Sequence, residues 1–185
     1  MTRRFFIDER TVLRPLAERD DARLFATVDA NREHLRRFLP WLDATRSQGE
    51  IALFRIRANA QEREGTGLAR VIERDYQIGG VVALNRVDQF NHRGELGYWI
   101  DRHLEGRGIC RRACEQLIQY AFDDLHLNRL SVVAAVDNRR SRALAERLGF
   151  TFEGVRRESE WLYDHYVDHA TYGLLRREWR PASRH

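Results

Sequence analysis

One stretch of the sequence restricts the possible folds more than any other. Residues 103–112, HLEGRGICRR, place two glycines one residue apart, directly before a helical pattern. From Arg107 to Asp124 the apolar side chains fall on one helical stripe: Ile109, Ala113, Leu117, Ile118, Ala121 and Phe122. A strand is predicted before the glycines at residues 95–100, and the β-branched run 130–136 predicts a buried strand after the helix. The stretch therefore indicates a unit of strand, glycine loop, helix and strand.

The remaining segments predict helices and strands around this unit. A strand is expected at residues 11–15, helices at 20–38 and near 48–63, and strands at 67–74 and 78–88. After residue 136 we expect a short helix from Asn138 that stops at Gly149, then closing strands at 150–158 and 166–176. No repeat, low-complexity segment or linker divides the chain. We therefore expect a single domain over residues 1–185, of the α/β class, with one mixed sheet.

The composition excludes several classes of protein. Hydrophobic residues make up 43% of the chain and charged residues 32%, which is typical of a globular protein and not of a disordered one. Apolar runs such as residues 79–84 are too short to cross a membrane, and the N-terminus lacks the features of an export signal, so a cytoplasmic protein is expected. Cys110 and Cys114 lie four apart without further metal-ligating residues nearby, so no metal site is predicted.

The charge pattern is a weak signal for nucleic-acid binding. All 32 basic residues are arginine, and the formal net charge is +4. Acidic residues are interleaved with the arginines, and no compact basic run alternates with aromatic residues. The pattern is compatible with a small polyanionic ligand or an acidic protein partner.

The glycine pair has two interpretations. A helix start carries unpaired N–H groups and the positive end of the helix dipole, which together suit an anion, and glycine lets a phosphate reach them. Alternatively, Gly106 and Gly108 form only a tight loop. The stretch lacks the Gly-Lys-Ser/Thr of a P-loop, and its glycine spacing is too short for a dinucleotide fingerprint.

Several motifs together indicate a family. HLEGRGI follows GELGYWI, and NRRSRALAERLGF comes about thirty residues later; this arrangement resembles the acetyl-coenzyme A signature of the GCN5-related N-acetyltransferases (GNAT). The segments HLRRFLPWL, VDNRRS, LGFTFEG and ESEWLYDHYVDHATYGL are similar, in order and spacing, to the RimJ/RimL-type ribosomal-protein N-terminal acetyltransferases. The similarity covers nearly the whole chain.

The resemblance implies a fold and a cofactor. The central mixed sheet, flanked by helices, should splay between the strand of residues 95–100 and that of residues 130–136, with acetyl-CoA in the gap and its pyrophosphate on the loop amides. His103 stands where the family usually has Gln or Arg. The cofactor-binding residues implied are Tyr98, Trp99, Ile100, His103, Gly106, Arg107, Gly108, Ile109, Cys110, Arg111, Asn138 and Ser141.

The resemblance also implies an N-acetyltransferase in which a primary amine attacks the thioester directly in a ternary complex. It places Glu160, in an aromatic setting, as the general base and Ser141 near the sulfur as the general acid. Glu95 is the second candidate for the base, and an exposed surface charge is the alternative for either glutamate. Asn138 would contact the pantetheine arm, although it could equally cap the helix that follows.

The acceptor stays open between several amines. The resemblance favours the N-terminal α-amine of a ribosomal or other protein. A polyamine, an antibiotic or an aminoacyl-tRNA would use the same chemistry, and the tRNA is the one nucleic-acid partner retained. An acyl-CoA-binding sensor without catalysis is the rival from another class, and a homo-oligomer is left open.

Overall fold

The computed structural model describes residues 3–181, so residues 1–2 and 182–185 of the predicted domain lie outside the described part. One eight-stranded sheet has the order β1-β2-β3-β4-β5-β6-β8-β7. Its strands are β1 (Phe5–Asp8), β2 (Thr11–Arg14), β3 (Leu68–Arg74), β4 (Gln77–Asp88), β5 (Arg93–Ile100), β6 (Arg129–Ala135), β7 (Thr151–Leu162) and β8 (His165–Leu175). The helices are α1 (Asp21–Ala30), α2 (Arg32–Arg36), α3 (Gln48–Glu64), α4 (Ile109–Asp123) and α5 (Arg139–Arg147), with short 3-10 turns η1 (Glu18–Asp20), η2 (Pro40–Ala44) and η3 (Arg102–Leu104) among the connections.

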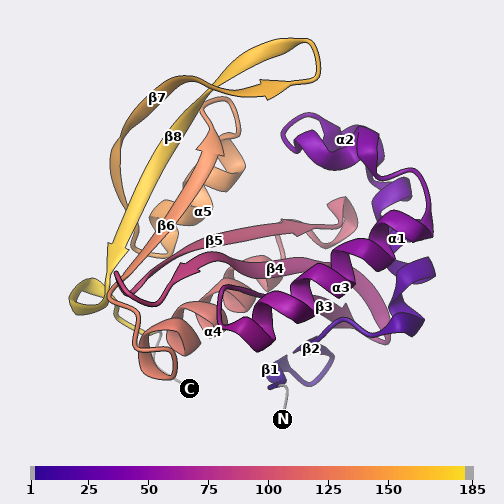
Figure 1. Ribbon diagram of the computed structural model, residues 1–185, viewed down its shortest axis with the longest axis horizontal. Helices are drawn as coiled ribbons and strands as arrows, with labels where there is room; N and C mark the ends of the chain where they lie inside the picture. The colour runs from indigo at the N-terminus through magenta and orange to yellow at the C-terminus, as the bar shows by residue number, and fades with distance from the viewer. Residues whose placement is uncertain (1–2, 182–185) are drawn as a thin grey trace.

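Helices cover both faces of the first half of the sheet (Figure 1). Because successive strand residues point to opposite faces, β3 contributes Ala69 and Val71 to one core and Leu68 and Ile72 to the other. Helices α1 and α3 pack on the Val71 face, and the apolar stripe of α4 packs on the Ile72 face. No helix within residues 3–181 has the length and apolar character needed to cross a lipid bilayer.

The sheet separates where its single parallel pair of strands meets. Strands β5 and β6 pair only at Arg93↔Arg129, Gly94↔Leu130 and Glu95↔Ser131. Beyond these residues β5 continues along β4 as far as Ile100, whereas β6 continues along β8. Figure 1 shows β6, β7, β8 and α5 leaning away from β5. The predicted mixed sheet, splayed at this point, is therefore confirmed.

The structure corrects the expected elements in two places near the N-terminus. Strand β1 was not predicted; it is four residues long and is held by pairing with β2 and by Phe5 against Tyr120, contacts that no local pattern reveals. The helix expected over residues 20–38 is two helices separated at Asn31. The Asn31 side chain donates to the carbonyl of Thr27 at 2.9 Å and accepts from the Arg102 amide at 3.0 Å, so it competes with helix hydrogen bonding.

Two further boundaries differ from the expected ones. Helix α4 begins at Ile109, not at residue 107, because Gly108 before it has a φ of +70°. Strands β7 and β8 extend to a two-residue turn at residues 163–164. The pairing of β7 with β8 shifts register between Arg156 and Glu160. The side chains of β7 therefore do not alternate between the two faces regularly enough for the sequence to show it.

A buried ion pair joins the strands to the first helices. Asp20 and Arg14 are 0% and 3% exposed, and two hydrogen bonds of 2.6 and 2.8 Å connect the guanidinium to the carboxylate. Arg14 also donates from Nε to Glu73 on β3 at 3.0 Å. Burial opposes the charge of Asp20, but hydrogen bonds from Arg14 and from the Ala17 amide outweigh it and lower the pKa of Asp20.

We expect Asp20→Asn to lower the free energy of unfolding by about 3–5 kcal/mol at neutral pH, because it leaves a buried guanidinium short of one carboxylate. The Asp20 pKa is lower in the folded than in the unfolded chain, so its stabilisation is present above the unfolded pKa and disappears as the pH falls through the folded pKa. Urea unfolding at pH 7 and in acid measures both effects. Asp75→Asn is the control, since Asp75 forms an exposed pair with Arg10. Equal stability of the two variants at pH 7 would contradict the prediction.

Candidate active site

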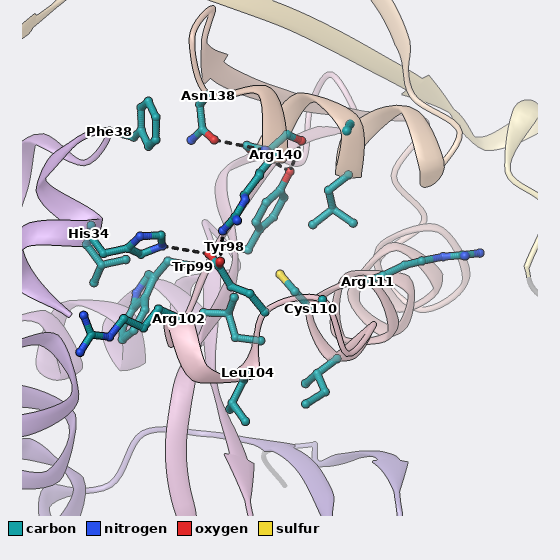
Figure 2. A pocket seen from close by; sticks show the side chains of 18 of the residues that line it. His34, Phe38, Tyr98, Trp99, Arg102, Leu104, Cys110, Arg111, Asn138 and Arg140 are labelled. Atoms are coloured by element: carbon teal, nitrogen blue, oxygen red, sulfur yellow. Dashed lines mark hydrogen bonds and ion pairs between the residues drawn. The ribbon is translucent and has the colours of Figure 1, made fainter. Parts of the chain in front are cut away.

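A cavity of about 900 Å³ occupies the gap between the separated strands. Its lining comes from the end of β5, the glycine loop with the start of α4, the start of α5, and α2 with the residues that follow it. Figure 2 shows these elements surrounding one space. The lining includes five arginines against one glutamate: Arg102, Arg111, Arg139, Arg140, Arg147 and Glu105. The cavity therefore suits an anionic ligand.

The glycine loop leaves the start of α4 open to the cavity. Gly106 and Gly108 have φ values of +73° and +70°, a region that side-chain-bearing residues rarely adopt. No side chain caps α4, and its first backbone hydrogen bond runs from the Arg112 amide to the Gly108 carbonyl at 3.1 Å. The amides of the first turn thus lack helical partners at the positive end of the helix dipole. A Cβ on Gly106 would meet nothing within 4 Å, so a ligand can approach this backbone.

The wall formed by β5 is linked to α5 through Tyr98 and Ser141. The Tyr98 hydroxyl lies 3.1 Å from both the carbonyl oxygen and Oγ of Ser141. Burial raises the pKa of Tyr98, so its hydroxyl keeps its proton at neutral pH. The Asn138 side chain accepts from the Ser141 amide at 3.2 Å and so caps α5, while its Nδ2 has no hydrogen bond within residues 3–181. The capping role and a ligand role for Asn138 are therefore compatible.

The two cysteines lie in different environments. Cys110 is half-buried and lines the cavity, whereas Cys114 is fully buried beneath it. Burial raises the pKa of the Cys114 thiol well above its usual value, which makes this sulfur a poor nucleophile. Residues 3–181 contain no group of three or more His, Cys, Asp or Glu side chains placed to hold a metal ion.

Most of the predicted cofactor residues meet at the cavity. Those that line it are Tyr98, Trp99, Ile100, Gly106, Gly108, Ile109, Cys110, Arg111, Asn138 and Ser141. His103 and Arg107 are exposed beside the loop and do not line the cavity.

The two predicted carboxylates also lie outside the lining. Glu95 is on the paired part of β5, and its Oε2 accepts from Arg86 at 3.1 Å. Glu160 is on β7, with its Oε2 3.3 Å from His169 Nε2.

A bridge of three polar side chains, absent from the sequence-based set, crosses the cavity. His34 Nε2 on α2 lies 2.9 Å from Glu105 Oε1, and Arg140 Nη1 on α5 pairs with the other oxygen of Glu105. Figure 2 shows His34 and Arg140 approaching each other from opposite walls. Glu105 stands inside the glycine motif, which is the one signal that could have drawn attention to it. His34 and Arg140 carry no such signal, because their roles arise from elements far apart in the sequence.

The far end of the cavity is apolar. Phe38 and Leu39, which follow α2, line it together with Trp99. Trp41 lies behind them, with its ring centroid 6.4 Å from that of Trp99. The cavity thus has an anion-binding end at the glycine loop and an apolar end at the segment after α2.

Residues 10–151 match the model of the acetyltransferase (GNAT) domain. The chain belongs to the GNAT acetyltransferase family. This confirms the resemblance inferred from the glycine loop and the motifs around it. GNAT enzymes use acetyl-CoA, so acetyl-CoA is the cofactor of this acetyltransferase.

The relatives of this GNAT chain include acetyltransferases named for ribosomal proteins. It is 34% identical over 177 residues to the putative ribosomal N-acetyltransferase YdaF of Bacillus subtilis (strain 168), covering 94% of this chain and 95% of that protein. Among solved structures, RimL, a ribosomal L7/L12 alpha-N-protein acetyltransferase in complex with coenzyme A, has a TM-score of 0.90 at 25% identity, over 94% and 98% of the two chains. The microcin C7 self-immunity acetyltransferase MccE, in complex with acetyl-CoA and AMP, has a TM-score of 0.86 at 26% identity, over 91% and 94%.

The cavity of this GNAT chain fits acetyl-CoA on its own geometry. The cofactor is long and carries a pyrophosphate at one part and an uncharged pantetheine arm at another. The amides of Gly106 and Gly108 donate no backbone hydrogen bond within residues 3–181 and are groups of the kind that bind a pyrophosphate, and Arg111 also lines this part of the cavity. The edge of β5 beyond Glu95, which has no partner strand on the cavity side, offers backbone groups to the pantetheine arm.

Proposed function

We propose that this protein transfers the acetyl group of acetyl-CoA to the N-terminal α-amine of a protein, with a ribosomal protein as the favoured acceptor. The observation that carries the proposal is the two-ended cavity of about 900 Å³, which is lined by the glycine loop at one end and by apolar side chains at the other. Similarity to the ribosomal-protein acetyltransferases over nearly the whole chain supports the choice of acceptor. Such an enzyme would act in the cytoplasm as a single domain of residues 1–185.

In this proposal the loop and strand β5 hold the cofactor. Amides at Gly106 and Gly108 and the guanidinium of Arg111 bind the pyrophosphate, and Asn138 Nδ2 contacts the pantetheine arm. When bound, acetyl-CoA supplies a thioester whose carbonyl carbon is open to attack by an amine. A backbone N–H on the free edge of β5 near Tyr98 would stabilise the charge that develops on the carbonyl oxygen. Holding the two reactants in line supplies much of the acceleration.

The protons move between side chains on opposite walls. The attacking amine loses a proton to Glu160, which lies outside the cavity lining and would therefore act through water. Glu95 is the second candidate for this role. Ser141 Oγ, which lies 3.1 Å from the Tyr98 hydroxyl, would donate a proton to the leaving sulfur, and the proton taken from the amine would return to Ser141 through water. An amide and free coenzyme A thiol result.

Direct attack by the amine, without an acyl-enzyme, is part of the proposal. Cys114 is buried and its raised pKa disfavours the thiolate. Cys110 lines the cavity beside the glycine loop, where we assign it packing against the cofactor.

The test measures release of free thiol from acetyl-CoA with a panel of amines. The panel contains a peptide with a free Ser N-terminus, the same peptide with its α-amine blocked and a lysine added, and spermidine. We expect the first peptide to react, with the acetyl group on its α-amine by mass spectrometry, and Cys110→Ala to retain turnover. Transfer only to spermidine would contradict the acceptor class. Tight acetyl-CoA binding with no transfer to any amine would favour an acyl-CoA-binding sensor without catalysis. Loss of turnover in folded Cys110→Ala would contradict direct attack.

A further inference from the structure

The tip of the β7–β8 hairpin docks on the segment that follows α2. The Tyr163 hydroxyl donates to the Leu39 carbonyl at 2.5 Å. The guanidinium of Arg36 lies 3.7 Å from the centroid of the Tyr163 ring. Arg36 is in turn fixed by two hydrogen bonds of 2.9 Å to the carboxylate of Asp43. The turn is therefore held by a hydrogen bond, a cation–π contact and an ion pair behind them.

The backbone of Tyr163 is strained at the docked tip. Its φ is +63°, a left-handed conformation in which glycine or asparagine is the usual hairpin residue and a bulky side chain is strained. Such a conformation is costly for a tyrosine, and at position 163 the side chain makes docking contacts that can offset the cost. These contacts are to Arg36, the last residue of α2, and to Leu39, in the segment that follows α2.

A second tyrosine in the same conformation provides an internal comparison. Tyr76, in the turn between β3 and β4, also has a φ of +63°, but it is 86% exposed. Tyr163 is half-buried, and burial raises the pKa of its hydroxyl, with the nearby Asp43 charge adding to the effect. Tyr163 therefore keeps the proton that it donates to Leu39.

The docked tip lies at the apolar end of the cavity. Leu39, whose carbonyl receives the hydrogen bond, lines the cavity together with Phe38. Figure 1 shows the β7–β8 tip and α2 on the two sides of the open end of the splayed sheet. Docking connects these two sides beside the apolar end of the cavity, and Leu39 is the cavity-lining residue that it holds.

We propose that Tyr163 determines acceptor specificity by fixing Leu39, and the segment around it, at the apolar end of the cavity. With this segment fixed, the apolar end admits the narrow end of an extended chain and excludes an amine with bulk immediately behind it. The inference rests on the proposed transfer to an α-amine and adds which α-amines are accepted. Tyr163 acts here as a positioning residue, since it fixes the segment around Leu39 and does not touch the reacting atoms.

The experiment compares two acceptor peptides, Ser-Ala-Ala-Ala and Ser-Trp-Ala-Ala, in wild type, Tyr163→Asn and Tyr163→Phe. Asparagine tolerates positive φ, so Tyr163→Asn should fold at least as well as wild type while losing both docking contacts. We expect wild type to prefer the narrow peptide in kcat/KM, and Tyr163→Asn to reduce that preference by roughly tenfold or more, within the range that pocket shape alone supplies. Tyr163→Phe keeps the aromatic ring beside Arg36 but loses the hydrogen bond to Leu39. Its preference should therefore lie between those of wild type and Tyr163→Asn. Tyr76→Asn, with the same change at the same φ, should leave the preference unchanged.

Hydrogen exchange supplies a readout that does not depend on turnover. Residues 159–166 and 36–44 should exchange faster in Tyr163→Asn than in wild type, and Tyr76→Asn should leave both segments protected. Unchanged exchange in Tyr163→Asn would overturn the docking. Faster exchange with an unchanged peptide preference would overturn the specificity role alone. A wild-type enzyme that acetylates neither peptide would instead contradict the proposed function, and with it the role of Tyr163 in acceptor specificity.

Discussion

Replacing Gly108 with valine is expected to weaken acetyl-CoA binding by roughly 100-fold or more, because several hydrogen bonds to a charged pyrophosphate are lost together. The φ of +70° suits glycine, and a Cβ would stand 3.1 Å from Arg112 Nη1. A branched side chain would also cover the amides at the start of α4. Calorimetry with acetyl-CoA measures the effect on binding directly.

The backbone strain of this substitution can be separated from its effect on the ligand. Gly65 ends α3 with the same φ of +70°, and a Cβ there would meet only Gln89 Nε2 at 3.6 Å. Gly65→Val should therefore lose stability for the same reason as Gly108→Val and still bind acetyl-CoA as wild type does. Thermal unfolding of both variants confirms that they are folded under the binding conditions. Similar affinities in the two variants would contradict the assignment of the glycine loop as the pyrophosphate cradle.

Glu160→Gln should reduce turnover by roughly 10²- to 10⁴-fold, the range expected for loss of a general base. Glutamine keeps the shape of the side chain but cannot take the proton of the amine. Acetyl-CoA binding should stay nearly intact, because Glu160 lies outside the cavity lining. The deficit should shrink as the pH rises past about 8, where more of the acceptor α-amine is already deprotonated. A pH–rate series against wild type measures both features.

Glu95→Gln is the matched comparison for this assignment. Glu95 lies on the paired part of β5 and accepts a hydrogen bond from Arg86. We therefore expect Glu95→Gln to lose less turnover than Glu160→Gln. Near wild-type rates for Glu160→Gln at neutral pH, together with a collapse for Glu95→Gln, would move the base to Glu95. A deficit in Glu160→Gln that does not change with pH would argue for a structural role of that carboxylate.

The parts of the fold that depend on local pattern could be predicted from the sequence. The six apolar residues assigned to the stripe of α4, from Ile109 to Phe122, are all buried against the sheet. Periodicity reports which face of a helix is buried whatever covers it. The glycine pair likewise marks a loop with positive φ, because few other residues adopt that conformation. Together with the motifs around it, this local information was enough to indicate the family and its cofactor.

The apolar end of the cavity was decided by tertiary structure alone. The cavity exists because β5 and β6 separate after Glu95 and Ser131, and that point depends on how whole strands pair. His34 and Glu105 are 71 positions apart in the sequence, and Tyr163 and Leu39 are 124 apart. Neither pairing has a local signature, since each is created by the packing of separate elements around the cavity. The sequence by itself therefore determined the fold class and the glycine loop at the start of α4, whereas the packing of separate elements decided which side chains line the cavity.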